Sequence, residues 1–498
     1  MLKQKQVVSF LQTKPVFLFL LPAFFVLHGS TVNYNAVTLK DGLLLMILYT
    51  GCAFIVAGIA WLFYRDIVKA SIIAFFLMLY HFFFGNLQDM LKSLSPQTFL
   101  SQYRFILPVS LLLFCLLILW IKKRKIPLLR FGFYLNLLLL TLIVIDTGWL
   151  VSRLTLRDRN NLLNPGTVTL RLCDTCQKPD IYLILVDQYA GNTALKDVFG
   201  FDNTLFVNDL TARGFHVAKK SSSNYNLTPF SMASLLNMDY LTPEMGVKKH
   251  LNVSYSYRLI KNSSVVQFLA ASGYQFYNYS IFDFPGYPAH QYHSFLPYGT
   301  KLITAQTLTG RLDRDIRTGI MEGKFGTESL QKKILYEDLH FNDSIFDLTR
   351  HIATQKTANP KFVYSHLMLP HHPYYFDSRG DSLPLKKLMR VKNNDSNDYI
   401  EYLRYGNKKI LQLIDDIVAG SPAPPVIMLL SDHGFRHPAK TIDRRYDFMN
   451  LNAIYLPDKN YSQFNDSLTN VNHFRVFFNS CFDQHLVLLK DSTIDLWD

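Results

Sequence analysis

The chain has 498 residues, enough for two or three domains, and 49% of them are hydrophobic. Its formal net charge is +13, but no basic stretch interleaved with aromatic residues is present, so nucleic-acid binding is not indicated. Leu, Phe and Ile dominate the first 151 residues, whereas the rest has the composition of a soluble α/β domain. We therefore expect a transmembrane domain at 1–152, a linker rich in Arg, Asn and Asp at 153–178, and a globular domain at 179–498.

The first part contains five long apolar runs, most of which approach the ~20 residues that cross a bilayer as a helix. They lie at about 15–30, 42–64, 70–91, 105–121 and 131–151. Buried core helices are the alternative, but the run at 105–121 carries no charged residue, which favours membrane spans. The first run is the shortest and has the length of a signal peptide, although the spans that follow it favour its retention.

Basic residues between the runs predict the orientation of the spans. If the N-terminus lies in the cytoplasm, ten Lys and Arg residues fall on the inside and three on the outside, which is a clear positive-inside bias. The inside residues are Lys3, Lys5, Lys14, Arg65, Lys69, Lys122, Lys123, Arg124, Lys125 and Arg130, and the outside residues are Lys40, Lys92 and Arg104. Five crossings then place everything after residue 151 outside the cytoplasm.

Two cysteines, Cys173 and Cys176, form a CDTC motif just after the last span. A local disulfide between them fits an oxidising compartment. A zinc knuckle would need a second pair, and Cys481 is the only other cysteine of the globular part. A redox motif would need a strand–CxxC–helix context that this segment lacks.

The globular part alternates apolar strand-like runs with helical stretches. Runs at 180–186, 362–369 and 426–430 have the continuous apolar character of strands buried on both faces. A helical stretch at 264–272 is followed by a strand-like segment at 274–280. This alternation predicts a mostly parallel sheet sandwiched by helices, in which ligands bind at the carboxyl ends of the strands.

Potential metal ligands follow these apolar runs. Asp187 ends the first run, and Asp432 and His433 follow the third in the motif SDHG. Each is also a common turn residue, but together at one sheet edge they suit a single Zn²⁺ or Mn²⁺ ion, with room for a second metal left open.

Thr228 stands just before Pro229 and an apolar helical stretch, which allows two interpretations. The first is that Thr228 caps the helix, with Pro229 at the first helical position. The second is that its hydroxyl is a nucleophile and the fourth partner of the metal, since both coordination and a helix N-terminus favour an alkoxide.

These motifs resemble the alkaline phosphatase superfamily in its sulfatase-like branch. The layout is similar to that of the membrane phosphoethanolamine transferases and lipoteichoic acid synthases, and to many uncharacterised bacterial sulfatase-like membrane proteins. In this resemblance Asp187 matches the first metal carboxylate, for which the two transferase families usually have Glu, and Asp432 and His433 match the other two ligands.

Thr228, in TPFSMASLL, matches the nucleophile of that superfamily. The sulfatase signature, C/S-x-P-S-R-A-x-L-L, begins with a cysteine or serine that becomes formylglycine, and Phe230 and Met232 replace its Pro and Arg. Threonine is not a formylglycine precursor, so the resemblance favours a threonine phosphotransferase over a true sulfatase.

Two histidines, His366 and His371 in SHLMLPHHPYY, match an H-x-x-x-x-H-x-P pattern near the substrate phosphate. His372 is adjacent, and we favour His371 because it lies two residues before the proline. Arg436 and His437, after SDHG, are further candidates for substrate contact, although a solvated basic loop has the same composition.

The resemblance implies transfer of a head group of the phosphoethanolamine or phosphoglycerol type from a membrane phospholipid, through a covalent Thr228 intermediate, to an envelope glycan or lipid acceptor. It also implies a multi-pass protein of the bacterial plasma (inner) membrane with its catalytic domain on the periplasmic side. A metal-dependent hydrolase would use the same residues. A non-catalytic envelope scaffold is the alternative of another class, and its signature would be a missing ligand.

Overall fold

The computed structural model describes residues 2–33, 37–94, 99–123, 128–163, 170–241, 253–290, 300–388, 396–436 and 441–496. The chain forms two compact units. One comprises Met1–Asn164 with Ser294–Ile316, and the other comprises Pro165–His293 with Arg317–Asp498. We refer to them as the membrane unit and the catalytic unit.

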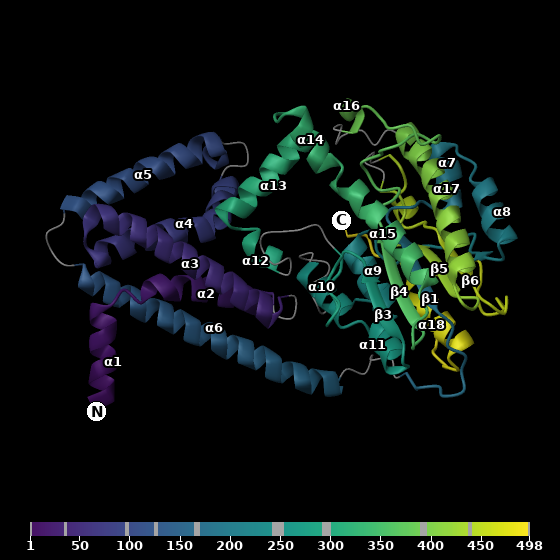
Figure 1. The fold of residues 1–498 in the computed structure, drawn as a ribbon, viewed down its shortest axis with the longest axis horizontal. Helices are drawn as coiled ribbons and strands as arrows, with labels where there is room; N and C mark the ends of the chain where they lie inside the picture. Colours follow the sequence, from purple (N-terminus) through teal and green to yellow (C-terminus); the bar gives the residue numbers. More distant parts are fainter. Residues whose placement is uncertain are drawn as a thin grey trace. The chain divides into compact units, whose positions relative to one another are not determined.

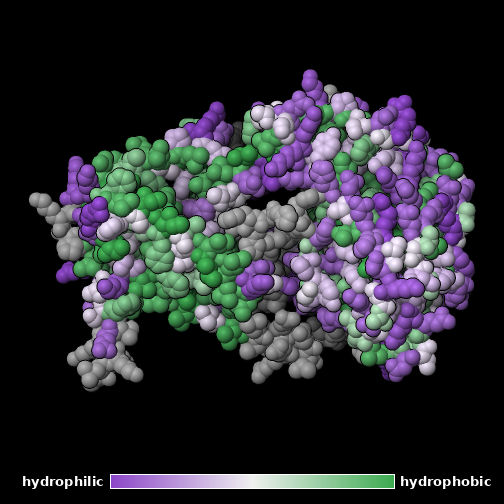
Figure 2. Space-filling model, in the orientation of Figure 1, coloured by the Kyte–Doolittle hydropathy of each residue, from purple (hydrophilic) through white to green (hydrophobic). Residues whose placement is uncertain are grey.

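The membrane unit consists largely of helices. They are α1 (Leu2–Thr13), α2 (Phe17–Val32), α3 (Leu39–Tyr64), α4 (Ile67–Leu94), the 3₁₀ turn η1 (Phe99–Ser101), α5 (Tyr103–Lys123) and α6 (Leu129–Leu163) (Figure 1). Four of these, α3, α4, α5 and the first part of α6, are long and apolar enough to cross a membrane. Hydrophobic residues cover the visible surface of these helices (Figure 2).

The first of the five predicted runs differs from the other four. It forms α2, an apolar helix of 16 residues, which at about 1.5 Å per residue is shorter than the hydrocarbon core of a bilayer. Its side chains Phe17, Leu21 and Phe25 are buried, and the helix packs against α3, α4 and α6. Of the five predicted runs, four therefore form helices long enough to cross a membrane, and the first, expected to be the shortest, forms a shorter apolar helix.

A segment that we had assigned to the globular domain belongs to the membrane unit. It contains α12 (Lys301–Thr304) and the first part of α13 (Leu308–Met321). The amide of Gly85 on α4 donates to the carbonyl of Gln306 at 2.8 Å, and a Cβ at Gly85 would lie 2.6 Å from that oxygen. Glycine is therefore required where this segment approaches α4.

The catalytic unit is built on a six-stranded mixed sheet with the order β2-β6-β5-β1-β4-β3. The strands are β1 (Ile181–Val186), β2 (His216–Val217), β3 (Gln275–Tyr279), β4 (Lys361–Leu367), β5 (Val426–Ser431) and β6 (Asn452–Tyr455). The run from β3 through β4 and β1 to β5 is parallel, and β6 and β2 pair antiparallel. The predicted mostly parallel sheet is therefore confirmed.

Helices cover both faces of this sheet. One face packs against α7 (Asn192–Phe199), α8 (Thr204–Ala212), α15 (Glu337–Thr354) and α17 (Ser396–Gly420), and the other against α9 (Thr228–Asn237), α10 (Val253–Lys261), α11 (Ser264–Ala271) and α18 (Asn470–Cys481). The short elements α14 (Glu328–Leu335) and α16 (Leu385–Leu388) each add a buried leucine, Leu335 and Leu388, to the first of these faces, and η4 is formed by Arg444–Asp447. Alternate residues of β1 enter the two cores, which explains why this strand is apolar throughout.

The register of the sheet brings the ends of its central strands to one edge. Val186, the last residue of β1, is opposite Leu367 of β4 and Ser431 of β5. Asp187 and Asp432, the next residues along β1 and β5, therefore leave the sheet side by side. Cys173 and Cys176 are joined by a disulfide in the segment that leads into β1.

Candidate active site

Two buried carboxylates, those of Asp187 and Asp432, form the base of the site at the carboxyl edge of the sheet. The turn after β1 holds the second of them, because the amide of Gln188 donates to Asp432 Oδ1 at 3.0 Å. To make this bond Gln188 adopts a φ of 62°, a left-handed conformation that is unusual for a residue with a side chain. Such backbone outliers often accompany functional sites.

The imidazole of His433 is oriented by its own turn. Its Nδ1 lies 2.7 Å from the carbonyl of Gly434, so that nitrogen carries the proton and donates it, while Nε2 presents a lone pair to the site. A Cβ on residue 434 would lie 2.4 Å from the carbonyl oxygen of Met449, which is why glycine follows the histidine. This turn explains the SDHG motif in physical terms.

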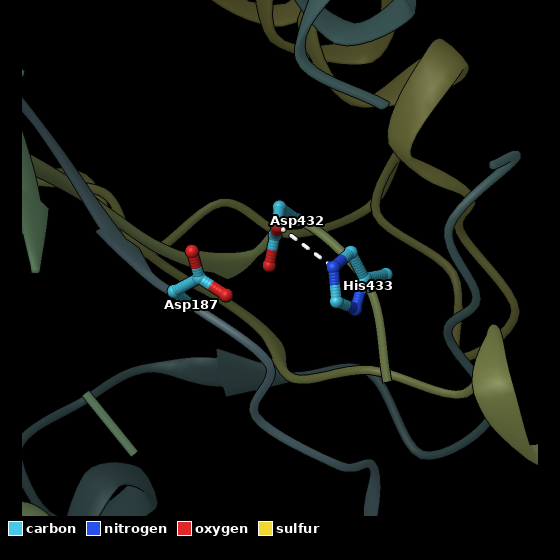
Figure 3. A group of neighbouring side chains, drawn as sticks. All are labelled: Asp187, Asp432 and His433. Atoms are coloured by element: carbon cyan, nitrogen blue, oxygen red, sulfur yellow. Dashed lines mark ion pairs between the residues drawn. The ribbon is translucent and has the colours of Figure 1, made fainter. Parts of the chain in front are cut away.

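The donor atoms of Asp187, Asp432 and His433 lie within 4.8 Å of one another, and all three residues are buried. In Figure 3 the carboxylate of Asp432 lies between that of Asp187 and the imidazole. His433 Nε2 and Asp432 Oδ2 are 3.2 Å apart. When Nδ1 holds the ring proton, these two atoms are both acceptors, so their approach requires a positive charge between them.

Unpartnered oxygens show that the site suits a cation. Among the residues that the structure describes, Asp187 Oδ1 and Asp432 Oδ2 are buried without a hydrogen-bond partner. Buried carboxylates are costly unless they are paired or coordinate a metal. Two carboxylates and one imidazole form a donor set that fits a divalent ion.

Neighbouring histidines keep Asp187 ionised. Burial alone would raise the pKa of this carboxyl, but His371, His366 and His433 outweigh that effect and hold the pKa below its ordinary range. A carboxylate that stays charged over the physiological pH range is available as a ligand.

The hydroxyl of Thr228 lies at the open side of this cluster. Its Oγ1 is 3.4 Å from His433 Nε2, and the side chain is only half-buried, unlike the three donors. The capping interpretation is wrong, because α9 begins at Thr228 itself, Leu227 occupies the cap position, and no side chain caps the helix. The hydroxyl thus stands in the first turn of α9, where the helix dipole favours negative charge.

Three histidines of the 366–372 segment take different positions. His366 is fully buried in β4, with Nε2 3.6 Å from Asp187 Oδ2, and its expected contact with the substrate phosphate stays a prediction. His371 is half-buried and its Nδ1 bonds the carbonyl of His372 at 2.6 Å, which leaves Nε2 for other partners. For His372, burial and the nearby His371 lower the pKa to about 4, so this ring is neutral near pH 7.

Two further candidates for substrate contact follow SDHG in the chain. Arg436 is half-buried, and His437 lies outside the described residues. Their expected contact with substrate stays a prediction.

Sequence reasoning missed two asparagines that fix the backbone of SDHG. Asn450 and Asn470 both donate to the carbonyl of Ser431, at 2.6 and 3.0 Å, and Asn450 also bonds Asn470. The hydroxyl of Ser231 donates to the carbonyl of Asp432. Ser231 lies only three residues after Thr228 in the sequence. Asn450, just before β6, and Asn470, at the start of α18, are distant from SDHG in the helices and strands they belong to, so no local pattern indicates their role.

With this geometry in place, comparison with known families identifies the class of protein. The sulfatase family model matches residues 180–477, more than half of the chain. The chain therefore belongs to the sulfatase family and is an enzyme of the sulfatase-like type, as the sequence motifs predicted. Comparison with curated proteins found no significant match.

Several solved structures are similar at low identity. The C-terminal periplasmic domain of EptC from Escherichia coli, also solved in complex with Zn, is 13% identical with a TM-score of 0.38, over 63% of this chain and 86% of that one. The corresponding domain of phosphoethanolamine transferase EptC from Campylobacter jejuni is 13% identical with a TM-score of 0.37, over 62% and 90%. A putative sulfatase from Bacteroides thetaiotaomicron is 12% identical with a TM-score of 0.39, over 64% and 74%.

Proposed function

We propose that the chain transfers a phosphoryl-linked head group, of the phosphoethanolamine or phosphoglycerol type, from a membrane phospholipid through Thr228 to an envelope glycan or lipid. The observation that carries this proposal is the half-buried Thr228 hydroxyl, 3.4 Å from His433 Nε2 at the first turn of α9. A hydroxyl so placed suits a nucleophile better than a structural threonine, because it makes no capping bond.

Asp187, Asp432 and His433 would hold one divalent ion, Zn²⁺ or Mn²⁺, with Thr228 at its open side. Such an ion supplies positive charge that lowers the pKa of a hydroxyl and stabilises charge on a phosphoryl group. The family membership and the donor set support the divalent ion, and the choice between the two metals is part of the proposal.

The residues of the chain account for the remaining steps. Thr228 Oγ1 attacks phosphorus and forms the new O–P bond, while the bond from phosphorus to the glycerol oxygen of the lipid breaks and the hydroxyl proton leaves to solvent. His371 Nε2 protonates the departing glycerol oxygen, since its Nδ1 is held by the carbonyl of His372. The acceptor hydroxyl then attacks the phosphorus of the phosphothreonine and forms a new O–P bond while its proton passes to His371 Nε2. The bond between Thr228 Oγ1 and phosphorus breaks, and the freed Thr228 takes up a proton from solvent.

The four helices that are long and apolar enough to cross a membrane support a donor that is itself a membrane lipid. We propose that the catalytic unit lies on the periplasmic side of a bacterial inner membrane, on the basis of the positive-inside distribution of Lys and Arg.

Mass spectrometry of Thr228 tests the proposal. The full chain in detergent, loaded with Zn²⁺ or Mn²⁺, is incubated with phosphatidylethanolamine or phosphatidylglycerol labelled in the head group, and the peptide containing Thr228 is analysed. We expect an adduct on Thr228 that Thr228→Ala abolishes and that Thr211→Ala, at an exposed position of α8, leaves unchanged. Labelled head group released to water without any modified acceptor would identify a hydrolase, and full turnover by Thr228→Ala would rule out the nucleophile.

A further inference from the structure

The C-terminal tail, which we define as residues 482–496, runs back along α18 after that helix ends. Asn479 donates to the carbonyl of Leu486 at 2.9 Å and accepts from its amide at 2.7 Å. Asn472 makes the same pair of bonds with Leu489, both at 2.8 Å. Each amide side chain therefore satisfies one N–H and one C=O of the tail, as a neighbouring strand would.

A buried arginine connects the same tail to the helix that begins with Thr228. Arg475 donates through Nη1 to the carbonyl of Val487 at 2.7 Å and through Nε to the carbonyl of Met238 at 2.7 Å. Met238 is the C-terminal cap of α9. One side chain thus holds both the tail and the far end of the helix.

The end of the tail reaches the loop that precedes Thr228. Asn224 donates to the carbonyl of Ser492 at 3.0 Å, and its own carbonyl accepts from the amide of Ile494 at 2.9 Å. Asn224 is fully buried, and its Oδ1 also accepts from the amide of Val471 at the start of α18. The loop, the tail and α18 meet at this residue.

A second buried asparagine lies two residues before Thr228. Asn226 donates to Asp495 Oδ1 at 2.8 Å, and its Oδ1 accepts from the amide of Leu496 at 3.2 Å. Asn226 is fully buried, so these bonds are not exchanged with water in the folded chain. The family match ends at residue 477, before any residue of this tail.

We propose that the tail is a strap that positions the nucleophile, with Asn226 and Asp495 as its positioning residues. The inference rests on the proposed role of Thr228. A loop held at two buried asparagines keeps the hydroxyl at His433, whereas a free loop would sample other conformations, and a misplacement of about 1 Å can cost about 100-fold in rate. Neither residue touches the reacting atoms.

Exchanging the two side chains tests the strap without removing it. Asn226→Asp sets two carboxylates against each other and loses the donor, so the loop should be released. Asp495→Asn alone keeps an acceptor oxygen for Asn226. In the double variant, Asn226→Asp with Asp495→Asn, the donor and acceptor are exchanged, so the bond should be restored.

Hydrogen exchange of the full chain in detergent measures directly how well the loop before Thr228 is ordered. We expect Asn226→Asp to raise amide exchange in residues 223–231 at least tenfold, and the double variant to return it to the parent value. Asn479→Asp, which weakens the tail at its far end, is the matched control and should leave this peptide unchanged. Unchanged exchange in Asn226→Asp, or no recovery in the double variant, would overturn the strap.

Turnover of the donor that labels Thr228 separates positioning from folding. We expect Asn226→Asp, assayed well below its melting transition, to lower kcat about 100-fold with KM and Zn²⁺ binding nearly unchanged, and the double variant to recover. A drop in melting temperature that accounts for the lost activity would make the contact merely structural and contradict the inference. If Thr228→Ala retains turnover, the proposed function fails, while the exchange data still decide whether the strap orders the loop.

Discussion

Arg311 of α13 contacts the carboxylate of Asp89 on α4, although 222 residues separate them in the sequence. The arginine side chain is 5% exposed and the aspartate 49% exposed. On the same segment, Asp315 accepts a hydrogen bond from Tyr103 of α5 at 2.7 Å. Side-chain contacts therefore hold the segment 300–316 to helices of its own unit that are distant in sequence.

Loss of the Asp89 carboxylate should loosen this inserted segment. Asp89→Asn leaves a buried guanidinium with neutral partners only, and we expect a loss of about 1–2 kcal/mol in stability, less than for a fully buried pair because Asp89 is half exposed. Thermal unfolding in detergent and the rate of trypsin cleavage at Arg314 measure the effect. Asp41→Asn, at the start of α3, serves as the control, and equal behaviour of the two variants would contradict the prediction.

Removing a carboxylate from the metal cluster should weaken both the metal-free and the metal-bound protein. His371, His366 and His433 stabilise the ionised Asp187 more than burial penalises it, so Asp187→Asn should lower the metal-free melting temperature. The same change should lower Zn²⁺ affinity by more than about 100-fold and abolish the stabilisation by added metal. Metal content and melting temperature with and without chelator measure both effects, and Asp415→Asn on the surface of α17 should show neither.

The sequence predicted the parts of the fold that depend on local pattern. Strands β1 and β5 are buried on both faces, so their apolar runs are continuous and their bounds agree with prediction to within one residue. Asp187 and Asp432 were expected together because parallel strands end at one edge, and the register places them there. In both cases the geometry of a parallel sheet links a residue's place in the sequence to its place in the fold.

Other features depend on contacts between distant polar residues, and these left no local signal. The attachment of 300–316 to the membrane helices relies on ordinary residues such as Gln306 and Arg311, which look like the surface of any helix. Asn224 and Asn226 resemble loop residues until the tail is seen against them. The capping interpretation of Thr228 failed because a cap and a first-turn hydroxyl differ by one residue in sequence.

Whether the short helix α2 crosses the membrane determines the side on which the N-terminus lies. If α2 crosses, Lys14 is cytoplasmic and Lys40 is outside; if it does not, both lie on one side. We expect a cysteine at Lys40, in a variant lacking Cys52, Cys115 and Cys481, to react with an impermeant maleimide in spheroplasts, and one at Lys14 to react only after lysis. Cysteines at Lys92 and Lys69 are the matched outside and inside controls. Labelling of Lys14 and Lys40 together in intact spheroplasts would show that α2 does not cross.

His473 of α18 should make the catalytic unit sensitive to mild acid. The ring is fully buried, and neither nitrogen has a hydrogen-bond partner among the described residues. Burial lowers its pKa to about 3, against about 6.5 in an unfolded chain. At pH values between these two pKa values, His473 is protonated in the unfolded chain but not in the folded chain. The free energy of unfolding therefore falls as the pH falls from 6.5 towards 3, and this group does not affect it above that range.

The variant His473→Leu removes the titrating imidazole and leaves the proposed metal ligands unchanged. From pH 7 to pH 5 the parent should lose about 2 kcal/mol more stability than His473→Leu. The reason is that proton binding to His473 stabilises the unfolded chain over this range, whereas the buried imidazole of the folded chain stays unprotonated. Denaturant unfolding of both proteins, with chelator present so that metal release does not contribute, gives the two slopes. The comparison depends on the change with pH rather than on absolute stability, so a packing defect introduced by leucine does not affect it. Parallel slopes would mean that His473 titrates normally and that water or an alternative ring position reaches it in the folded state.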